Sequence, residues 1–396
     1  MARIRSVLFW LHLAVGVIAG GVILIMALTG VALTYQKQMT SWADLRGLDG
    51  APGAGFTAPM ATPALLAAAA TERKGTPTAV VWRNGPALPV EVQFGREGRL
   101  FVNAYTGAIL GEGSVAMRGI FRWVTDWHRW LATSGENRPL GKRLTGAANL
   151  AFLLIVLSGM WLWWPRRATV QALRRVTWFR RGLSAKARDF NWHNVIGFWS
   201  AVPLAVVVAS GVVISYGWAG DLVYRLVGEL PPARSAPAAT EANVGTPTAA
   251  RAANRESRSE DVVIPAALDQ QLAVARAAQR NWRTISLTLP KSDTAPSMFS
   301  VDHGMGGEPH KKTRLSVDAA GAVVSTQRFA DQSTGRRARS ILRFAHTGEV
   351  LGVVGQTIAG LISLGTAVLV LTGLALSGRR LRAWLARRRT PPPHAA

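Results

Sequence analysis

Residues 190–220 read FNWHNVIGFWSAVPLAVVVASGVVISYGWAG and contain no Asp, Glu, Lys or Arg. Three further stretches share that property, at residues 7–34, 144–165 and 350–378. About 20 apolar residues span the hydrocarbon core of a bilayer as a helix, and backbone groups there must be satisfied internally. The sequence therefore predicts four transmembrane helices. The first is interpreted as an uncleaved helix, because no small-residue cleavage site follows it at residues 35–37.

The net charge of +24 is concentrated in three short segments: before the first helix, between the second and third helices, and after the fourth. In a soluble protein such a charge would suggest a nucleic-acid partner. Short basic segments that flank membrane helices instead stay in the cytoplasm, where they contact anionic lipid. We therefore expect both termini to be cytoplasmic, the bilayer to be the main partner, and no nucleic acid to bind.

The expected fold class is a membrane protein with a four-transmembrane-helix bundle, built from two helix–module–helix repeats. Each of the two small periplasmic modules is of the α+β type, because an Ala-rich helical stretch is followed by short strand-like stretches. The expected segments are a first helix (1–35), a first module (36–140), a second helix (141–165), a basic loop (166–189), a third helix (190–220), a linker with a second module (221–345), a fourth helix (346–378) and a basic tail (379–396).

Histidines recur at matching places in the two halves of the chain. His12 opens the first apolar run, and His193 opens the third at an offset of 181 residues. His128 precedes the second run, and His346 precedes the fourth. Other residues that match between the halves are Gly16 with Gly197, Thr29-Gly30 with Ser210-Gly211, Tyr35 with Tyr216, and Ser158-Gly159 with Thr372-Gly373. The repeat indicates a duplicated unit built around these imidazoles.

The predicted topology places His12 and His193 at the cytoplasmic side and His128 and His346 at the outer side. Two repeats related by approximate symmetry would bring each pair face to face, and facing imidazoles are an axial ligand set for haem iron. Zinc is a competing hypothesis, but no carboxylate lies at ligand spacing beside these histidines. A structural role at a helix end also remains open. The Ser/Thr-Gly pairs are interpreted as packing sites, which support a haem only weakly.

Other residue types exclude several chemistries. The chain contains no cysteine, so disulfides, thiolate-held iron–sulfur clusters and thioether-attached haem are excluded. No phosphate-binding glycine loop, nucleophile elbow or dinucleotide fingerprint is present, so electrons would come from a separate cytoplasmic-side donor. His303 and His310 lie in a Gly-rich loop for which contact with a metal or an anionic chelate is one hypothesis and a solvated surface is the favoured one. His394 lies in a Pro-rich tail.

Several motifs resemble the PepSY-associated transmembrane family. They are AHTGEVLG at residues 345–352 with VLTGL at 370–374, WLH at 10–12 with LTGV at 28–31, and NAYTG at 103–107, which is similar to the turn of a PepSY module. The likeness covers nearly the whole chain. It implies a bacterial inner-membrane protein in which His12, His193, His128 and His346 are axial ligands of two haems b. Two departures are the second turn, which reads DAAG at 318–321, and the absence of tryptophans at the end of the fourth helix.

The function that this resemblance implies is electron transfer from a cytoplasmic-side donor to a periplasmic ferric siderophore, which would make the protein an oxidoreductase. One alternative is a haem-free membrane protein whose modules bind or regulate a periplasmic partner or protease. A second alternative is a transporter component. The transporter is disfavoured because no charged residue lies within the four apolar runs.

Overall fold

The computed structural model describes residues 2–53, 55–164, 169–233, 262–292 and 294–389. Most of the expected linker, Arg166 and Arg167 of the expected basic loop, and His394 lie outside the described residues. The chain forms two compact units. The bundle unit comprises Met1–Thr34, Arg122–Leu226 and Ala345–Ala396, and the sheet unit comprises Tyr35–Phe121 and Val227–Phe344.

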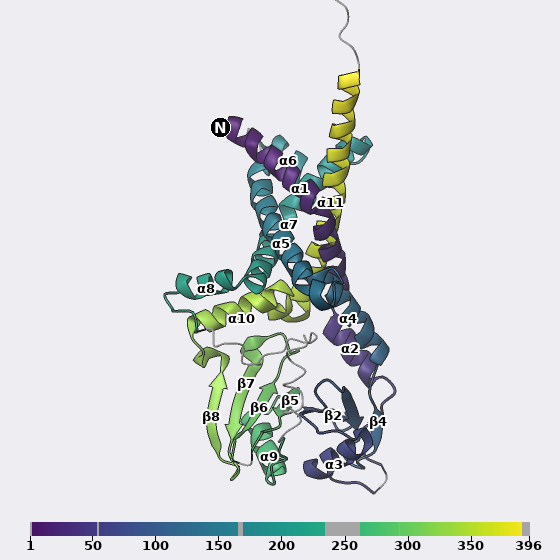
Figure 1. The fold of residues 1–396 in the computed structure, drawn as a ribbon, viewed down its shortest axis with the longest axis vertical. Helices are drawn as coiled ribbons and strands as arrows, with labels where there is room; N and C mark the ends of the chain where they lie inside the picture. The colour runs from purple at the N-terminus through teal and green to yellow at the C-terminus, as the bar shows by residue number, and fades with distance from the viewer. Residues whose placement is uncertain (1, 54, 165–168, 234–261, 293, 390–396) are drawn as a thin grey trace, which may run out of the picture. The chain divides into compact units, whose positions relative to one another are not determined.

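The described residues of the bundle unit include four long helices (Figure 1). They are α1 (Ala2–Leu33), α5 (Arg138–Trp163), α7 (Ala185–Ser215) and α11 (Gly352–Arg389). Within the described residues, these four helices, with the short turns that lead into α5 and α11, are long and apolar enough to cross a membrane. The prediction of four membrane helices is confirmed, and the chain is a multi-pass membrane protein.

Helices α1 and α5 lie within three residues of their expected limits, whereas α7 and α11 differ from theirs by five residues or more. Helix α11 continues to Arg389 instead of ending at residue 378, because arginine is as good a helix former as the apolar residues before it. Helix α7 runs from Ala185 to Ser215 instead of 190–220, since Tyr216 has an extended backbone and α8 (Gly217–Leu226) begins after it. Hydropathy marks the part of a helix that lies in lipid, and the helix itself can be longer or shorter.

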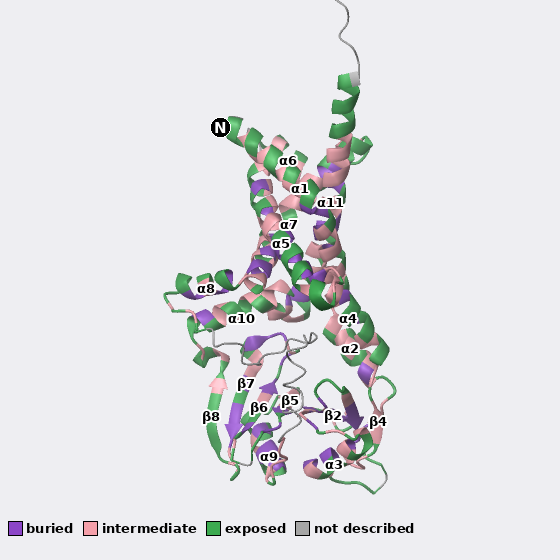
Figure 2. Ribbon diagram, in the orientation of Figure 1, coloured by how far each residue is buried: buried purple, intermediate pink, exposed green. Residues whose placement is uncertain are grey.

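Helix α1 packs against α5 and α11, and α7 packs against the same two helices. Helices α1 and α7 therefore occupy opposite corners of the bundle. The interior is built from small and aliphatic side chains, among them Ala19, Ala148 and Val208. Large apolar side chains such as Ile18 and Val202 are exposed, as expected for helices that face lipid. Exposed residues occur along all of the long helices (Figure 2).

The internal repeat is visible in the helix contacts. A Cβ atom added to Gly30 on α1 would lie 3.3 Å from the Ser363 hydroxyl on α11, and one added to Gly211 on α7 would lie 2.9 Å from the Asn149 amide on α5. Gly30 and Gly211 are equivalent positions of the repeat, as are Asn149 and Ser363. The two halves of the bundle thus place equivalent residues in equivalent contacts.

Short helices that the hydropathy pattern did not predict precede or follow the long helices in the chain. They are α2 (Gln36–Leu45), α4 (Val115–Trp130), α6 (Val170–Thr177), α8, α10 (Thr334–His346), and the single turns η1 (Gly135–Asn137) and η6 (Glu349–Leu351). His128 and His346 lie at the C-terminal ends of α4 and α10. Both histidines are therefore held by helices of their own, close to the starts of α5 and α11.

The described residues of the sheet unit form one antiparallel sheet of eight strands, ordered β4-β3-β2-β1-β5-β6-β7-β8. The strands are β1 (Ala79–Arg83), β2 (Val90–Gln93), β3 (Arg99–Val102), β4 (Ile109–Gly111), β5 (Thr284–Thr288), β6 (Ser297–Asp302), β7 (Lys312–Val317) and β8 (Val323–Arg328). The two expected modules are thus joined into one sheet through the pairing of β1 with β5, where Val81 lies opposite Ser286. This pairing removes two open strand edges that separate modules would leave.

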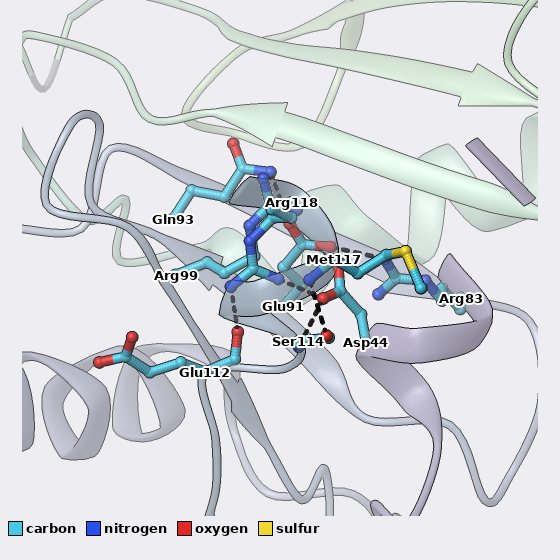
Figure 3. A network of polar contacts seen from close by, with 9 residues as sticks. All are labelled: Asp44, Arg83, Glu91, Gln93, Arg99, Glu112, Ser114, Met117 and Arg118. Atoms are coloured by element: carbon cyan, nitrogen blue, oxygen red, sulfur yellow. Dashed lines mark hydrogen bonds and ion pairs between the residues drawn. The ribbon is translucent and has the colours of Figure 1, made fainter. Parts of the chain in front are cut away.

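Helices α3 (Thr62–Arg73) and α9 (Leu268–Ala278) pack in one apolar core with one face of this sheet. Burial alternates along β1 and over most of β6, so that residues such as Val80 and Phe299 join the helix-covered core. The opposite face is mainly polar. Its Glu91 pairs with Arg83 and Arg99, as Figure 3 shows.

The turns at residues 103–108 and 318–322 are similar in their hydrogen bonds, but the second turn is one residue shorter, because Asn103 pairs with Ala108 and Asp318 with Ala322. The Asn103 carboxamide oxygen accepts hydrogen bonds from the amides of Tyr105 and Thr106. The Asp318 carboxylate accepts hydrogen bonds from the amides of Ala320 and Ala322. Both turns end on a glycine with positive φ, at 73° and 82°. The missing threonine in the second turn therefore leaves the turn intact.

Candidate functional site

The structure brings the four histidines together as two pairs. The ring centroids of His12 and His193 are 6.4 Å apart, and those of His128 and His346 are 6.3 Å apart. The first pair joins α1 to α7 across the bundle, and the second joins the ends of α4 and α10. Each predicted pair is thus the pair that the structure forms.

The two pairs lie at different levels along the bundle. His12 lies on α1, and Thr29 on the same helix contacts His128 of the other pair. Seventeen residues of helix separate His12 from Thr29, which corresponds to about 25 Å along the axis at 1.5 Å per residue. The site therefore has two ends, separated by most of the thickness of a bilayer core.

Hydroxyl groups orient both rings of the first pair. His12 Nδ1 lies 2.9 Å from the Ser158 hydroxyl oxygen, and His193 Nδ1 lies 3.0 Å from the Thr372 hydroxyl oxygen. Both hydroxyls already donate their single hydrogen to backbone carbonyls of their own helix, at 3.1 Å for Ser158 and 2.7 Å for Thr372. With that hydrogen engaged, each hydroxyl oxygen is placed to accept a hydrogen bond from an imidazole N–H.

The second pair has the same arrangement with one change. His128 Nδ1 lies 3.0 Å from the Thr29 hydroxyl, which donates to a backbone carbonyl at 2.6 Å. His346 Nδ1 lies 2.8 Å from the carbonyl oxygen of Val207, which can only accept. Ser210 corresponds to Thr29 in the repeat, and its hydroxyl donates to that same carbonyl. In both rings Nδ1 carries the hydrogen.

These hydrogen bonds favour the same tautomer in all four rings, with the hydrogen on Nδ1. In a neutral imidazole with hydrogen on Nδ1, the other nitrogen, Nε2, has a free lone pair and is a metal ligand. A metal–imidazole bond of about 2 Å on each side, with about 1 Å from each nitrogen to its ring centre, separates two facing ring centroids by roughly 6 Å. The observed separations of 6.4 and 6.3 Å suit one metal ion between each pair.

In three of the four Ser/Thr-Gly pairs the glycine leaves room for an imidazole. A Cβ atom on Gly159 would lie 3.3 Å from His12 Cε1, and one on Gly373 would lie 3.3 Å from His193 Cε1. At Gly30 the distance to His128 Cε1 would be 3.6 Å. The interpretation of these pairs as packing sites was therefore incomplete, because hydroxyl and glycine together contact His12, His193 and His128.

The remaining histidines do not join this arrangement. His303 Nδ1 lies 3.0 Å from the side-chain oxygen of Gln279 in the sheet unit. His310 belongs to η4 (Pro309–Lys311) in the same loop. The part of the chain that the structure describes contains no group of three or more His, Cys, Asp or Glu residues that could hold a metal ion. Each histidine pair has only two such residues and therefore does not count as a group of this kind.

The fold and the site define a class: a multi-pass membrane protein whose four-helix bundle carries a pair of oriented imidazoles at each of two levels. Comparison with protein families assigns the chain more closely. The PepSY-associated TM region matches residues 9–380, and the chain belongs to that family. No match was found among curated proteins. The resemblance seen in the sequence motifs is thus confirmed.

Proposed function

We propose that this protein is a di-haem oxidoreductase of the bacterial inner membrane that passes electrons to a periplasmic ferric siderophore. The observation that carries the proposal is the pair of close imidazoles at each level, each ring with its Nδ1 hydrogen bonded and its Nε2 left as a ligand. His12 with His193, and His128 with His346, would each hold one haem b. The ring centroids of the two pairs are 6.4 and 6.3 Å apart, which suits one iron ion between the rings of each pair.

The donor set suits haem better than zinc. A structural zinc site takes four protein ligands and a catalytic site three, whereas each site here offers two imidazoles. Haem brings its own four equatorial nitrogens, so two axial imidazoles complete the coordination of its iron. When bound, haem supplies a one-electron iron couple. The hydrogen bonds from Nδ1 to Ser158, Thr372, Thr29 and Val207 would orient the rings and raise their basicity as ligands.

Topology gives the two levels different roles. Basic residues cluster beside the ends of the bundle that carry His12 and His193, with Arg5 near the start of α1 and Arg379 near the end of α11. We propose that this side is cytoplasmic and faces the electron donor. The level of His128 and His346 then faces the periplasm. Reduction of chelated Fe(III) to Fe(II) takes one electron, and oxygen-donor chelators hold Fe(II) more weakly, so the iron is released.

Reconstituted vesicles test this function. Protein is inserted in liposomes that enclose an impermeant reductant, and a ferric siderophore with an Fe(II)-specific dye is added outside. We expect Fe(II) to form outside only when protein is present. His346→Ala should abolish this reduction, and His303→Ala should leave it unchanged. Haem-loaded vesicles that form no Fe(II) with any ferric chelate would overturn the proposed substrate.

A further inference from the structure

The polar face of the sheet contains a cavity of about 570 Å³ that belongs entirely to the sheet unit. Its lining includes Ser286 and Thr288 of β5, Ser300 of β6, and Glu91 of β2. We name it the seam cavity, because it extends over β1 and β5, the two strands at which the halves of the sheet join. A volume of this size suits a small-molecule ligand, for which pockets of about 300–1,000 Å³ are usual.

The strand pairing explains why the cavity needs both halves. Across the sheet, Glu91 lies opposite Val81, Val81 opposite Ser286, and Ser286 opposite Ser300. The first two residues come from the first half of the chain and the last two from the second. Side chains that are directly opposite one another project to the same face. The cavity floor is therefore formed only when β1 pairs with β5.

Positive charge exceeds negative charge around this cavity. The Glu91 carboxylate is 3 % exposed and pairs with Arg83 at 2.5 Å and Arg99 at 2.7 Å. The Asp302 carboxylate pairs with Lys312 at 3.5 Å, and Lys37 also lines the cavity. Two carboxylates thus face four cationic side chains, counting Arg83 beside the cavity. The excess favours an anionic ligand.

Arg83 also offers an unused hydrogen-bond donor. Its Nη1 atom is buried and has no hydrogen-bond partner within the described residues. Buried donors in folded proteins almost always have an acceptor, so this atom favours an additional acceptor beside Glu91. The hydroxyls of Ser286, Thr288 and Ser300 add further donors to the floor. Together they suit a ligand rich in oxygen atoms.

We propose that the seam cavity binds an anionic, oxygen-rich chelate of the hydroxycarboxylate class. The identity of the chelated metal as ferric iron rests on the proposed function, whereas binding itself needs no haem. The net positive lining supplies attraction, and the hydroxyl floor supplies hydrogen bonds to carboxylate and hydroxyl oxygens. The sheet unit would thereby capture the compound that the bundle reduces.

Gallium(III) citrate is the probe, because it has the charge and shape of the ferric chelate and is not reduced. Isothermal titration of the full-length protein in detergent should show saturable binding. Ser286→Phe fills the cavity and should raise Kd at least tenfold. Ser325→Phe is the matched control, since Ser325 continues the same sheet face on β8, is exposed and does not line the cavity. The control should bind as the wild type does.

A second variant keeps the test valid if Ser286→Phe does not fold. Lys37→Gln removes one exposed cation and should weaken binding several-fold without loss of folding. Absence of saturable binding to the wild type, or equal binding by the wild type, Ser286→Phe and Lys37→Gln, would overturn the proposal. Binding by a colourless protein would leave the seam cavity assigned and the haem function refuted. Haem-loaded protein that does not bind gallium(III) citrate would refute the seam cavity as a binding site and leave the haem function standing.

Discussion

The Nδ1 atom of His193 lies 3.0 Å from the hydroxyl oxygen of Thr372, which is 179 residues further along the chain. The first half of the bundle repeats this contact between His12 and Ser158 at 2.9 Å. Both copies of the duplicated unit have thus kept this hydrogen bond as well as the helices around it. Three predictions follow from what these contacts do to the rings, and a fourth concerns the sheet unit.

Thr372→Val should change the electronic properties of one haem without releasing it. Valine keeps the shape of threonine and removes the hydroxyl that accepts from His193. A less basic imidazole stabilises Fe(III) less, so the midpoint potential of one haem should rise while the other stays constant. Potentiometric titration followed by absorbance measures both values.

Thr366→Val is the control for that experiment. Thr366 is also a buried threonine of α11 that donates to a backbone carbonyl, at 2.9 Å, but no histidine of the described part of the chain bonds to it. Its substitution should leave both potentials unchanged. Equal shifts in the two variants would show that the hydroxyl of Thr372 has no special relation to His193.

Gly373→Leu should displace the imidazole of His193. A Cβ atom at residue 373 would already lie 3.3 Å from the ring, and the rest of a leucine side chain has no room there. We expect the variant to hold one haem instead of two. Gly378→Leu on the same helix is the control, because a Cβ atom at residue 378 meets no atom within 4 Å. Retention of two haems by Gly373→Leu would contradict the proposed position of the ligand.

Substitution of one histidine should affect only its own pair. His12→Ala and His193→Ala should each lose the same haem, because both remove an axial ligand of one iron. The spectrum of the remaining haem should be identical in the two variants and different from that of the one left in His128→Ala. Two distinct residual spectra for His12→Ala and His193→Ala would show that these residues do not share an iron.

Glu91 should make the sheet unit sensitive to acid. Burial raises the pKa of Glu91, but the charges of Arg99 and Arg83 and the hydrogen bonds from Arg83 and Gln93 outweigh it, so the pKa lies below its ordinary value of 4.5. A carboxyl with a lowered pKa stabilises the fold fully above the pKa of the unfolded chain. That contribution is lost as the pH falls below 4.5 and through the lower pKa of the folded state.

Glu91→Gln tests this dependence. Removing one partner of a buried ion pair costs about 3 kcal/mol, so the variant should unfold at a lower temperature at pH 7. The difference from the wild type should shrink as the pH falls below 4.5. Glu112→Gln is the control: Glu112 pairs with Arg73 at an exposed position, where a pair contributes about 0–1 kcal/mol. A difference for Glu91→Gln that does not change with pH would contradict the account.

The sequence was sufficient to predict the membrane helices and the histidine pairs. A run such as residues 190–220 can be stable only as a helix in lipid, and equal spacing in two copies places His12 and His193 at equivalent positions. The structure agrees on both points. The hydrogen bonds of Ser158 and Thr372 to the histidines could not be predicted from the sequence, because a hydroxyl beside a glycine is equally suited to helix packing.

The continuous sheet could not be predicted from the sequence. Strand β1 pairs with β5, and about 200 residues separate them, so no local pattern records the pairing. Alternation within each strand indicates which face is apolar but not which strand lies beside it. The seam cavity depends on that pairing and was absent from the expectations for the same reason. Helices α4 and α10 were missed because they are too short and too polar to stand out beside the membrane helices.

The haem content of the purified protein tests the central claim most directly. The chain is expressed in haem-replete cells, purified in detergent, and assayed for haem b by the pyridine haemochrome method against polypeptide concentration. Two oriented imidazole pairs predict two haems b per chain and a low-spin spectrum with a sharp α band on reduction. A colourless protein that is correctly folded would contradict the claim that these histidines hold haem.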